Sequence, residues 1–133
     1  MAEPNVIHVQ SLYAAFGRGD LDYIVRACAP DASWEVVGRP QDFSTFGVRT
    51  GPAGVTEFFS ALQAAKTIVE FTPQAFYACN GTVFVEGHEV SIDKKSGFRI
   101  DTPWLHAFTF RDGEIIRFRE FLDTAQFAEA ARS

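Results

Sequence analysis

Two ionisable residues, His106 and Glu120, lie in adjacent segments whose alternate positions are otherwise apolar. Residues two apart in a strand share a face, and here they are Trp104, His106, Phe108 and Phe110, then Ile116, Phe118, Glu120 and Leu122. Asp112-Gly113 between the segments is typical of a two-residue hairpin turn. The segments are therefore predicted to pair antiparallel, with His106 and Glu120 on the same sheet face. Because burying an unpartnered carboxylate costs several kcal/mol, we expect this face to line a cavity.

These residue types are suited to proton transfer. A neutral imidazole can give or take a proton near pH 7, and a desolvated carboxyl group has a raised pKa. We predict acid–base catalysis by His106 with Glu120, assisted by Glu89, on a substrate that bears a carbonyl or an epoxide. The alternative left open is a histidine satisfied by a glutamate in a non-catalytic ligand-binding or dimerisation module.

The sequence predicts neither a metal nor a cofactor. His8 and His88 have no ligand-like spacing, and His88 must point away from any cavity that Glu89 faces. No phosphate-binding loop or dinucleotide fingerprint occurs. Cys28 and Cys79 lie far apart and are interpreted as two buried, reduced thiols.

The composition indicates a globular protein with a substantial core. The chain has 133 residues, of which 47% are hydrophobic and 14 are phenylalanine, so residues 1–133 are expected to form one domain. A net charge of -5 without a basic run disfavours nucleic acid and acidic membranes as partners. With no basic leader and no stretch long enough to span a bilayer, we expect a cytoplasmic protein.

The apolar spacing predicts helices first and strands afterwards. Helices are expected at residues 5–17, from Asp20 to just before Pro30, from Pro52 onward and after Asp123, with strands at 32–37, 69–77, 82–92, 98–110 and 114–122. A loop over 38–51 contains Phe43 and Phe46, so we expect it to fold over something apolar. This order predicts an α+β fold with the helices on one face of a curved antiparallel sheet.

Four segments carry a resemblance to a known family, namely GRGDLDYIV, PDASWEVVG, TGPAGVTEFF and RDGEIIRFREFLDTAQF. Through them nearly the whole chain resembles the SnoaL-like and ketosteroid-isomerase-like proteins of the nuclear-transport-factor-2-like superfamily. The resemblance implies a cone-shaped curved antiparallel sheet wrapped around the N-terminal helices, the cystatin-like α+β roll. It also implies that the hollow cone binds a small, largely apolar or amphipathic molecule, with cofactor-independent isomerase, cyclase or hydrolase chemistry among its activities. The residues expected to line the hollow are Tyr13, Trp34, Val36, Phe46, Phe59, Trp104 and Phe118.

The ketosteroid isomerase pattern is incomplete when it is carried over residue by residue. Its general base falls on Val36, which cannot accept a proton. Its oxyanion-hole tyrosine falls on Leu12, one residue before Tyr13, and its protonated aspartate falls on His106, which can still donate a hydrogen bond. The missing base argues against steroid isomerisation by that mechanism.

The end of the chain also looks like limonene epoxide hydrolase. Glu120 and Glu89 match its two carboxylate positions, whereas the position of its bridging arginine holds Gly87. Its water-positioning tyrosine and asparagine fall on Trp34 and Val36. A hydrolase of this type without the bridging arginine is therefore an alternative function.

The outer face of the predicted sheet also has apolar residues. Leu105, Ala107 and Phe121 lie on the face opposite His106 and Glu120. An apolar set of this kind needs a cover, so we predict a homodimer formed through this outer face.

Overall fold

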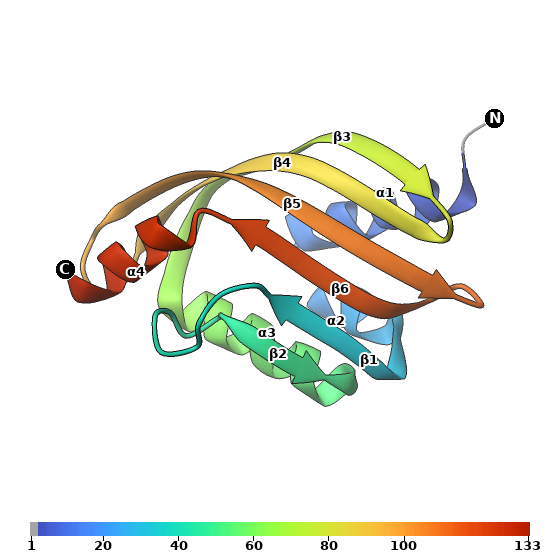
Figure 1. Cartoon of the computed structure of the whole chain (residues 1–133), viewed down its shortest axis with the longest axis horizontal. Helices are drawn as coiled ribbons and strands as arrows, with labels where there is room; N and C mark the ends of the chain where they lie inside the picture. The colour runs from blue at the N-terminus through green and yellow to red at the C-terminus, as the bar shows by residue number, and fades with distance from the viewer. Residues whose placement is uncertain (1–2) are drawn as a thin grey trace.

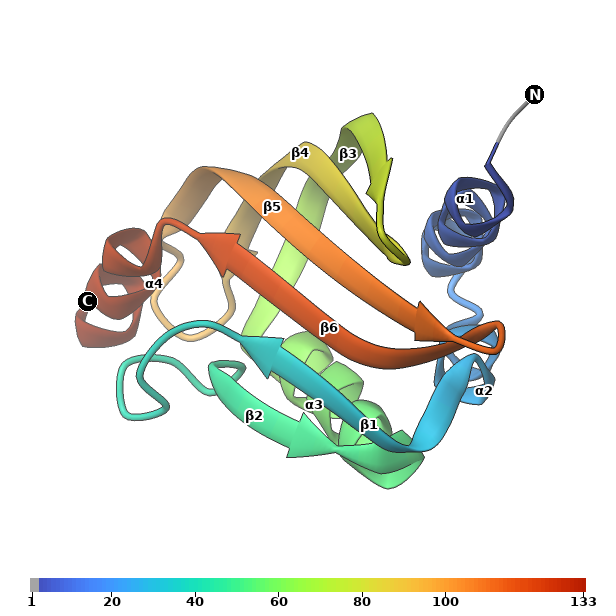
Figure 2. The same cartoon turned by 45° about the vertical axis from the view of Figure 1, so that its right-hand side comes forward.

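The computed structural model describes residues 3–133 and contains a six-stranded, strongly curved sheet (Figure 1). In chain order the elements are α1 (Pro4–Gly17), α2 (Leu21–Arg26), β1 (Cys28–Val36), β2 (Gly47–Thr50), α3 (Gly51–Ala65), β3 (Lys66–Cys79), β4 (Thr82–Asp93), β5 (Arg99–Arg111), β6 (Glu114–Leu122) and α4 (Thr124–Arg132). The strands are arranged in the order β2-β1-β6-β5-β4-β3. In Figure 2, α2 and α3 lie behind the sheet, α1 stands beside it at the right, and α4 lies at the opposite end. The predicted cone-shaped α+β fold is confirmed.

Two tight turns set the register of the strands that carry the predicted site. Asn80-Gly81 has φ angles of 51° and 78°, and Asp112-Gly113 has 52° and 80°, as type I′ hairpin turns require. The second turn pairs β5 with β6 so that His106 lies directly opposite Glu120, as predicted. Glu89 lies on β4, the other neighbour of β5.

The predicted end of the second helix is wrong. Helix α2 ends at Arg26, and Cys28 already belongs to β1, so Pro30 lies inside a strand rather than after a helix. The pairing of β1 with β6 shifts register between Cys28 and Ser33. Proline has no N–H to donate to a ladder, which explains why the strand tolerates it only at this irregularity. Of the two thiols, Cys28 is buried as predicted, whereas Cys79 is exposed.

The sheet is mixed rather than antiparallel throughout, because β1 runs parallel to β6. The predicted loop over 38–51 ends in the short strand β2, which pairs antiparallel with β1. The rings of Phe43 and Phe46 pack on Phe127 of α4, with centroids 5.1 and 5.6 Å from it. The loop therefore covers an apolar residue of the protein itself.

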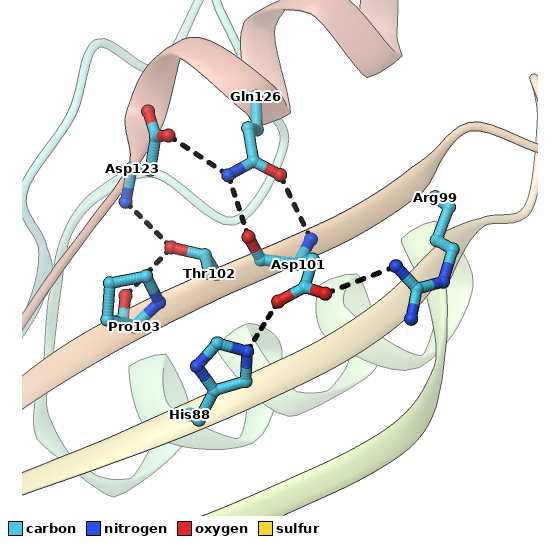
Figure 3. Close-up of polar contacts among 7 residues, drawn as sticks. All are labelled: His88, Arg99, Asp101, Thr102, Pro103, Asp123 and Gln126. Carbon is cyan, nitrogen blue, oxygen red and sulfur yellow. Dashed lines mark hydrogen bonds and ion pairs between the residues drawn. The ribbon is translucent and has the colours of Figure 1, made fainter.

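Helix α4 is held against β5 by polar contacts (Figure 3). Strand β6 ends at Leu122, so the part of β5 before Trp104 has no β6 residue beside it. There the backbone N–H of Asp101 donates to Oε1 of Gln126 at 2.9 Å, and Nε2 of Gln126 donates to the Asp101 carbonyl at 2.8 Å. The side chain of Gln126 thus satisfies both backbone groups. Within residues 3–133, no helix has the length and hydropathy needed to cross a bilayer.

Candidate functional site

The concave face of the sheet and helices α1–α3 enclose a cavity of about 60 Å³. Its wall is mostly aromatic and aliphatic. The residues of the wall with ionisable side chains are Tyr13, Lys66, Glu89, His106 and Glu120. The three predicted acid–base residues therefore all border one cavity, together with Lys66, which no pattern in the sequence indicates.

Tyr13, His106 and Glu120 form a chain of short hydrogen bonds across this wall. The phenol oxygen of Tyr13, on α1, lies 2.6 Å from Nδ1 of His106, on β5. The other ring nitrogen, Nε2, lies 2.6 Å from Oε2 of Glu120, on β6. Both nitrogens of the imidazole are engaged, so His106 has none left for a ligand. The two ends of this relay, Tyr13 and Glu120, both border the cavity.

The directions of these hydrogen bonds follow from the charge of Glu120. An ionised carboxylate only accepts, so Nε2–H of His106 donates to it. When the imidazole is neutral, Nδ1 accepts the O–H of Tyr13. When the imidazole is protonated, Nδ1–H donates to the phenol oxygen, and the Tyr13 O–H is free to donate to another group. The protonation state of His106 thus decides whether Tyr13 presents an acceptor or a donor.

Burial and charge act on the two ends of the relay in different ways. Burial tends to raise the pKa of Glu120, but the charge and hydrogen bond of His106 and the charge of Lys66 outweigh it, so this pKa lies below its usual range. A raised glutamate pKa, which desolvation alone predicts, is therefore wrong at Glu120. Burial, and secondarily the charge of Glu120, holds the pKa of Tyr13 well above its ordinary value. Tyr13 is accordingly a neutral phenol across the physiological pH range.

Lys66 and Glu89 form a second buried polar pair in the cavity wall. Nζ of Lys66 lies 2.5 Å from Oε2 of Glu89, and their side chains are 4% and 2% exposed. The ammonium group also lies 4.9 Å from the ring centroid of Phe127. Lys66 follows directly after α3, where a lysine is typical of a solvated helix end, so its position in the chain does not indicate burial. Only the acidic Glu89 on the concave face signals that a cation is needed nearby.

Trp104 packs against two rings of the relay. Its indole stacks on the imidazole of His106 at 4.0 Å and on the ring of Tyr13 at 5.9 Å. It also stacks on Phe71 at 4.8 Å. Trp104 was expected in the cavity wall, but the structure places it outside the wall. It fixes the plane of the histidine ring instead.

The other predicted lining residues divide into two groups. Trp34, Phe59 and Phe118 border the cavity as expected, together with Tyr13. Val36 is buried in the core without bordering the cavity, and Phe46 packs on α4 at a different place, so these two expectations are wrong. The sequence indicates that the loop containing Phe46 needs an apolar partner. It does not indicate that this partner is Phe127 of α4 rather than a ligand in the cavity.

His88 lies away from the cavity, as the alternation with Glu89 predicts. Its Nε2 pairs with Oδ1 of Asp101 at 2.5 Å (Figure 3). Arg99 binds the other oxygen of the same carboxylate at 3.2 Å. The hydrogen bonds from His88 and Arg99 lower the pKa of Asp101. In residues 3–133, no group of three or more histidine, cysteine or acidic side chains is arranged to hold a metal ion.

Comparison with known proteins gives a family match and many structural matches. The family model described as "SnoaL-like domain" matches residues 9–118. Among curated proteins, none matches the chain. The NTF2-like protein of unknown function from Burkholderia pseudomallei K96243 is 23% identical, with a TM-score of 0.87 over 99% of this chain and 100% of that one.

Two further solved structures reach slightly higher identity. An NTF2-like protein from Burkholderia xenovorans LB400 is 27% identical, with a TM-score of 0.84 over 95% of this chain and 94% of that one. TerC, co-crystallized with polyporic acid, is 25% identical, with a TM-score of 0.82 over 98% of this chain and 100% of that one.

Proposed function

Because this chain belongs to the SnoaL-like domain family, we propose that it binds a small, largely apolar molecule in the cone and transfers a proton to or from it. The fold of this family is one that commonly binds small ligands and includes isomerases and cyclases. The finer part of the proposal assigns the contact with the reacting molecule to Tyr13. His106 and Glu120 are proposed to determine whether the phenol group of Tyr13 donates or accepts a hydrogen bond.

The engagement of both His106 nitrogens carries this assignment. Nδ1 is occupied by Tyr13 and Nε2 by Glu120, so a proton reaches the imidazole through one of these two neighbours. Tyr13 is assigned this role because its neutral phenol can both donate and accept, whereas the ionised Glu120 only accepts. With neutral His106, the phenol oxygen takes a proton from the ligand while its own proton moves to Nδ1. In the reverse direction, the Tyr13 O–H protonates the ligand while Nδ1–H replaces the lost proton. Glu120 stabilises the imidazolium in both directions, as the acidic member of a catalytic triad does.

The Lys66–Glu89 pair has a different role in this proposal. Glu89 is held in an ion pair with Lys66 and is not free to act as a base. Lys66 also lowers the pKa of Glu120, so it keeps the acidic end of the relay ionised. This revises the predicted role of Glu89 from an assisting catalytic residue to a positioning residue.

Epoxide hydrolysis of the limonene type is not favoured by the arrangement. The mechanism needs an arginine at the position of Gly87, and the indole of Trp104 fills the space there. A Cβ atom on Gly87 would lie 2.1 Å from a Trp104 ring carbon. Trp34 and Val36 supply neither of the groups that would position a water in that mechanism.

Ligand binding is tested first. Polyporic acid, which was crystallised with TerC, is titrated into the protein by calorimetry together with an anthraquinone, a steroid and a monoterpene. Trp34 borders the cavity, so its fluorescence gives a second readout. We expect at least one compound to bind, with a 1:1 stoichiometry. Failure of the entire panel to bind would overturn the binding proposal.

The catalytic part is tested with three nearly isosteric variants, Tyr13→Phe, His106→Phe and Glu120→Gln. For a bound compound that the wild-type protein converts, Tyr13→Phe should keep its Kd within a few-fold and lose about 10²–10⁴ in kcat, the usual contribution of general acid–base catalysis. Normal turnover by Tyr13→Phe would contradict the assignment. If the compounds bind and none is converted, the protein is a ligand-binding module, and Tyr13→Phe, His106→Phe and Glu120→Gln should bind them as the wild type does.

A further inference from the structure

A second hollow, of about 300 Å³, lies beside the cavity, between the end of α1 and strand β3. The residues that line it are Tyr13, Phe16, Gly17, Ile68, Phe71 and Pro73. Three of them, Tyr13, Phe16 and Phe71, also line the inner cavity. The two hollows are therefore the two sides of one aromatic wall.

The sizes of the two hollows decide what each can hold. An apolar cavity of about 150 Å³ is known to take up benzene. The inner cavity, at about 60 Å³, is less than half as large and does not accommodate even one such ring. The outer hollow has about twice the benzene-binding volume. A ring-bearing ligand that reaches Tyr13 must therefore keep part of its body in the outer hollow.

Part of the aromatic wall belongs to an edge strand whose ladder is irregular. Phe71 belongs to β3, one of the two edge strands, which is hydrogen-bonded to β4 alone. Its ladder with β4 is interrupted by irregularities between Ile68 and Glu70 and between Pro73 and Ala75, on both sides of Phe71. Bulges disrupt the ladder locally and bend the strand. Phe71 contacts the ring of Phe16 at 5.1 Å and that of Tyr13 at 6.3 Å, so a shift of β3 widens the passage between the hollows.

The lining also indicates the chemistry of the occupant. The described residues of the outer hollow are uncharged, and apart from the Tyr13 hydroxyl their side chains are apolar, so the polar part of its surface comes from that hydroxyl and from backbone atoms. The polar groups Lys66, Glu89, His106 and Glu120 all border the inner cavity only. An elongated molecule with an apolar end and an oxygen-bearing end matches this division.

We infer that the outer hollow is a second subsite, which holds the apolar, ring-bearing body of an elongated ligand while its oxygen-bearing end passes the aromatic wall to Tyr13. This inference rests on the proposed function, since it extends the same ligand beyond the cavity. Ile68, Gly17 and Pro73 then determine which ligands are accepted, although they lie outside the inner cavity.

The inference is tested by placing larger side chains in the outer hollow, one from each of two opposite walls. Ile68→Trp acts from β3, and Gly17→Phe acts from the end of α1, where a Cβ atom would meet nothing within 4 Å. Val69→Trp is the matched control, because Val69 is the next residue of β3, is 59% exposed and lies outside both hollows. Leu62→Trp fills the inner cavity alone. Kd is measured by calorimetry with polyporic acid, or with the tightest binder of the panel.

Ile68→Trp and Gly17→Phe should each weaken binding at least tenfold, whereas Val69→Trp should stay within twofold of the wild type. If Leu62→Trp weakens binding and both outer variants bind normally, the second subsite is overturned while the proposed function stands. If the wild-type protein binds nothing, the proposed function is overturned. If circular dichroism shows that the outer variants do not fold, the amide NMR signals of Gly17 and Ile68 in the wild-type protein test whether the ligand occupies the outer hollow. They must shift on titration, and unchanged signals overturn the subsite.

Discussion

The indole of Trp104 lies directly over Gly87 of the neighbouring strand, in the space that any larger residue at position 87 would occupy. A Cβ atom on Gly87 would come within 2.1 to 2.5 Å of three ring atoms of Trp104. The same indole stacks on His106 at 4.0 Å. The absence of a side chain at Gly87 therefore sets the position of the tryptophan, and the tryptophan sets the plane of the histidine ring.

Gly87→Ala should consequently destabilise the protein, although alanine is ordinarily the better residue in regular structure. The methyl group must displace Trp104, and overpacking of this kind costs about 1–3 kcal/mol. The free energy of unfolding is measured by urea denaturation. Gly17→Ala is the control, because its Cβ atom meets nothing within 4 Å and should cost nothing. Equal stability of Gly87→Ala and the wild type would contradict the role assigned to Gly87.

The tautomer of His106 is a second prediction, because Glu120 accepts a hydrogen bond from Nε2. In ¹⁵N spectra of the histidine side chains, neutral His106 should carry its proton on Nε2, with Nδ1 as an acceptor from Tyr13. Tyr13→Phe should keep this tautomer and shift the Nδ1 signal, while the signals of His8 and His88 stay in place as internal controls. A proton on Nδ1 of the neutral wild-type ring would rule out the relay in the direction described.

Local patterns in the sequence predict the strands and the histidine–glutamate pairing, because both depend on neighbours in the chain. The Asp112-Gly113 turn fixes which residues of β5 and β6 face each other, so His106 and Glu120 were predictable as a pair. Alternation likewise places His88 and Glu89 on opposite faces. The fold needed more than these patterns, since the arrangement of helices inside the cone came from resemblance to a family.

The missed features all depend on contacts between distant parts of the chain. Lys66 is paired with Glu89 although it lies opposite Asp93 in the β3–β4 ladder, so the register of the strands does not indicate the pair. Tyr13 forms a hydrogen bond with His106, which lies 93 residues later in the chain, and no periodic pattern in the sequence indicates this contact. The parallel pairing of β1 with β6 depends in the same way on packing, because no turn joins the two strands directly.

The two thiols should differ in reactivity. Burial, and secondarily the charge of Glu114, raises the pKa of Cys28 to about 12, and its Sγ–H group donates to the carbonyl oxygen of Ile24 at 3.5 Å. Cys79 is exposed. Because the thiolate is the reactive form, Ellman's reagent at pH 8 should modify one thiol per native chain and two in urea. Cys79→Ser should abolish the native reaction and Cys28→Ser should preserve it. Rapid modification of native Cys79→Ser would contradict the burial of Cys28.

The outer sheet face leads us to propose that the protein pairs with a second copy of itself. Helices α1–α3 cover only the concave face, and the opposite face of β4–β6 is open in Figure 2. Phe84 and Phe121 are each 37% exposed there, and Leu105 lies directly opposite Phe121. Sedimentation at micromolar concentration should give a dimer, which Phe121→Glu converts to monomer. Ile7→Glu, at an exposed isoleucine on α1, is the control and should leave the dimer intact. A monomeric wild type would disprove the pairing.

The lowered pKa of Glu120 predicts how stability depends on pH. A carboxyl group whose pKa is lower in the folded than in the unfolded state stabilises the fold above its ordinary pKa, about 4.3 for glutamate. This contribution is lost as the pH falls through the lower folded value. Glu120→Gln should therefore be less stable than the wild type at pH 7, by about 1.5–3 kcal/mol for a charged hydrogen bond, and the difference should shrink as the pH falls below 4. Urea denaturation from pH 7 to pH 3 measures it, with the exposed Glu129→Gln as control. A difference that is independent of pH would show that Glu120 is not held ionised by His106 and Lys66.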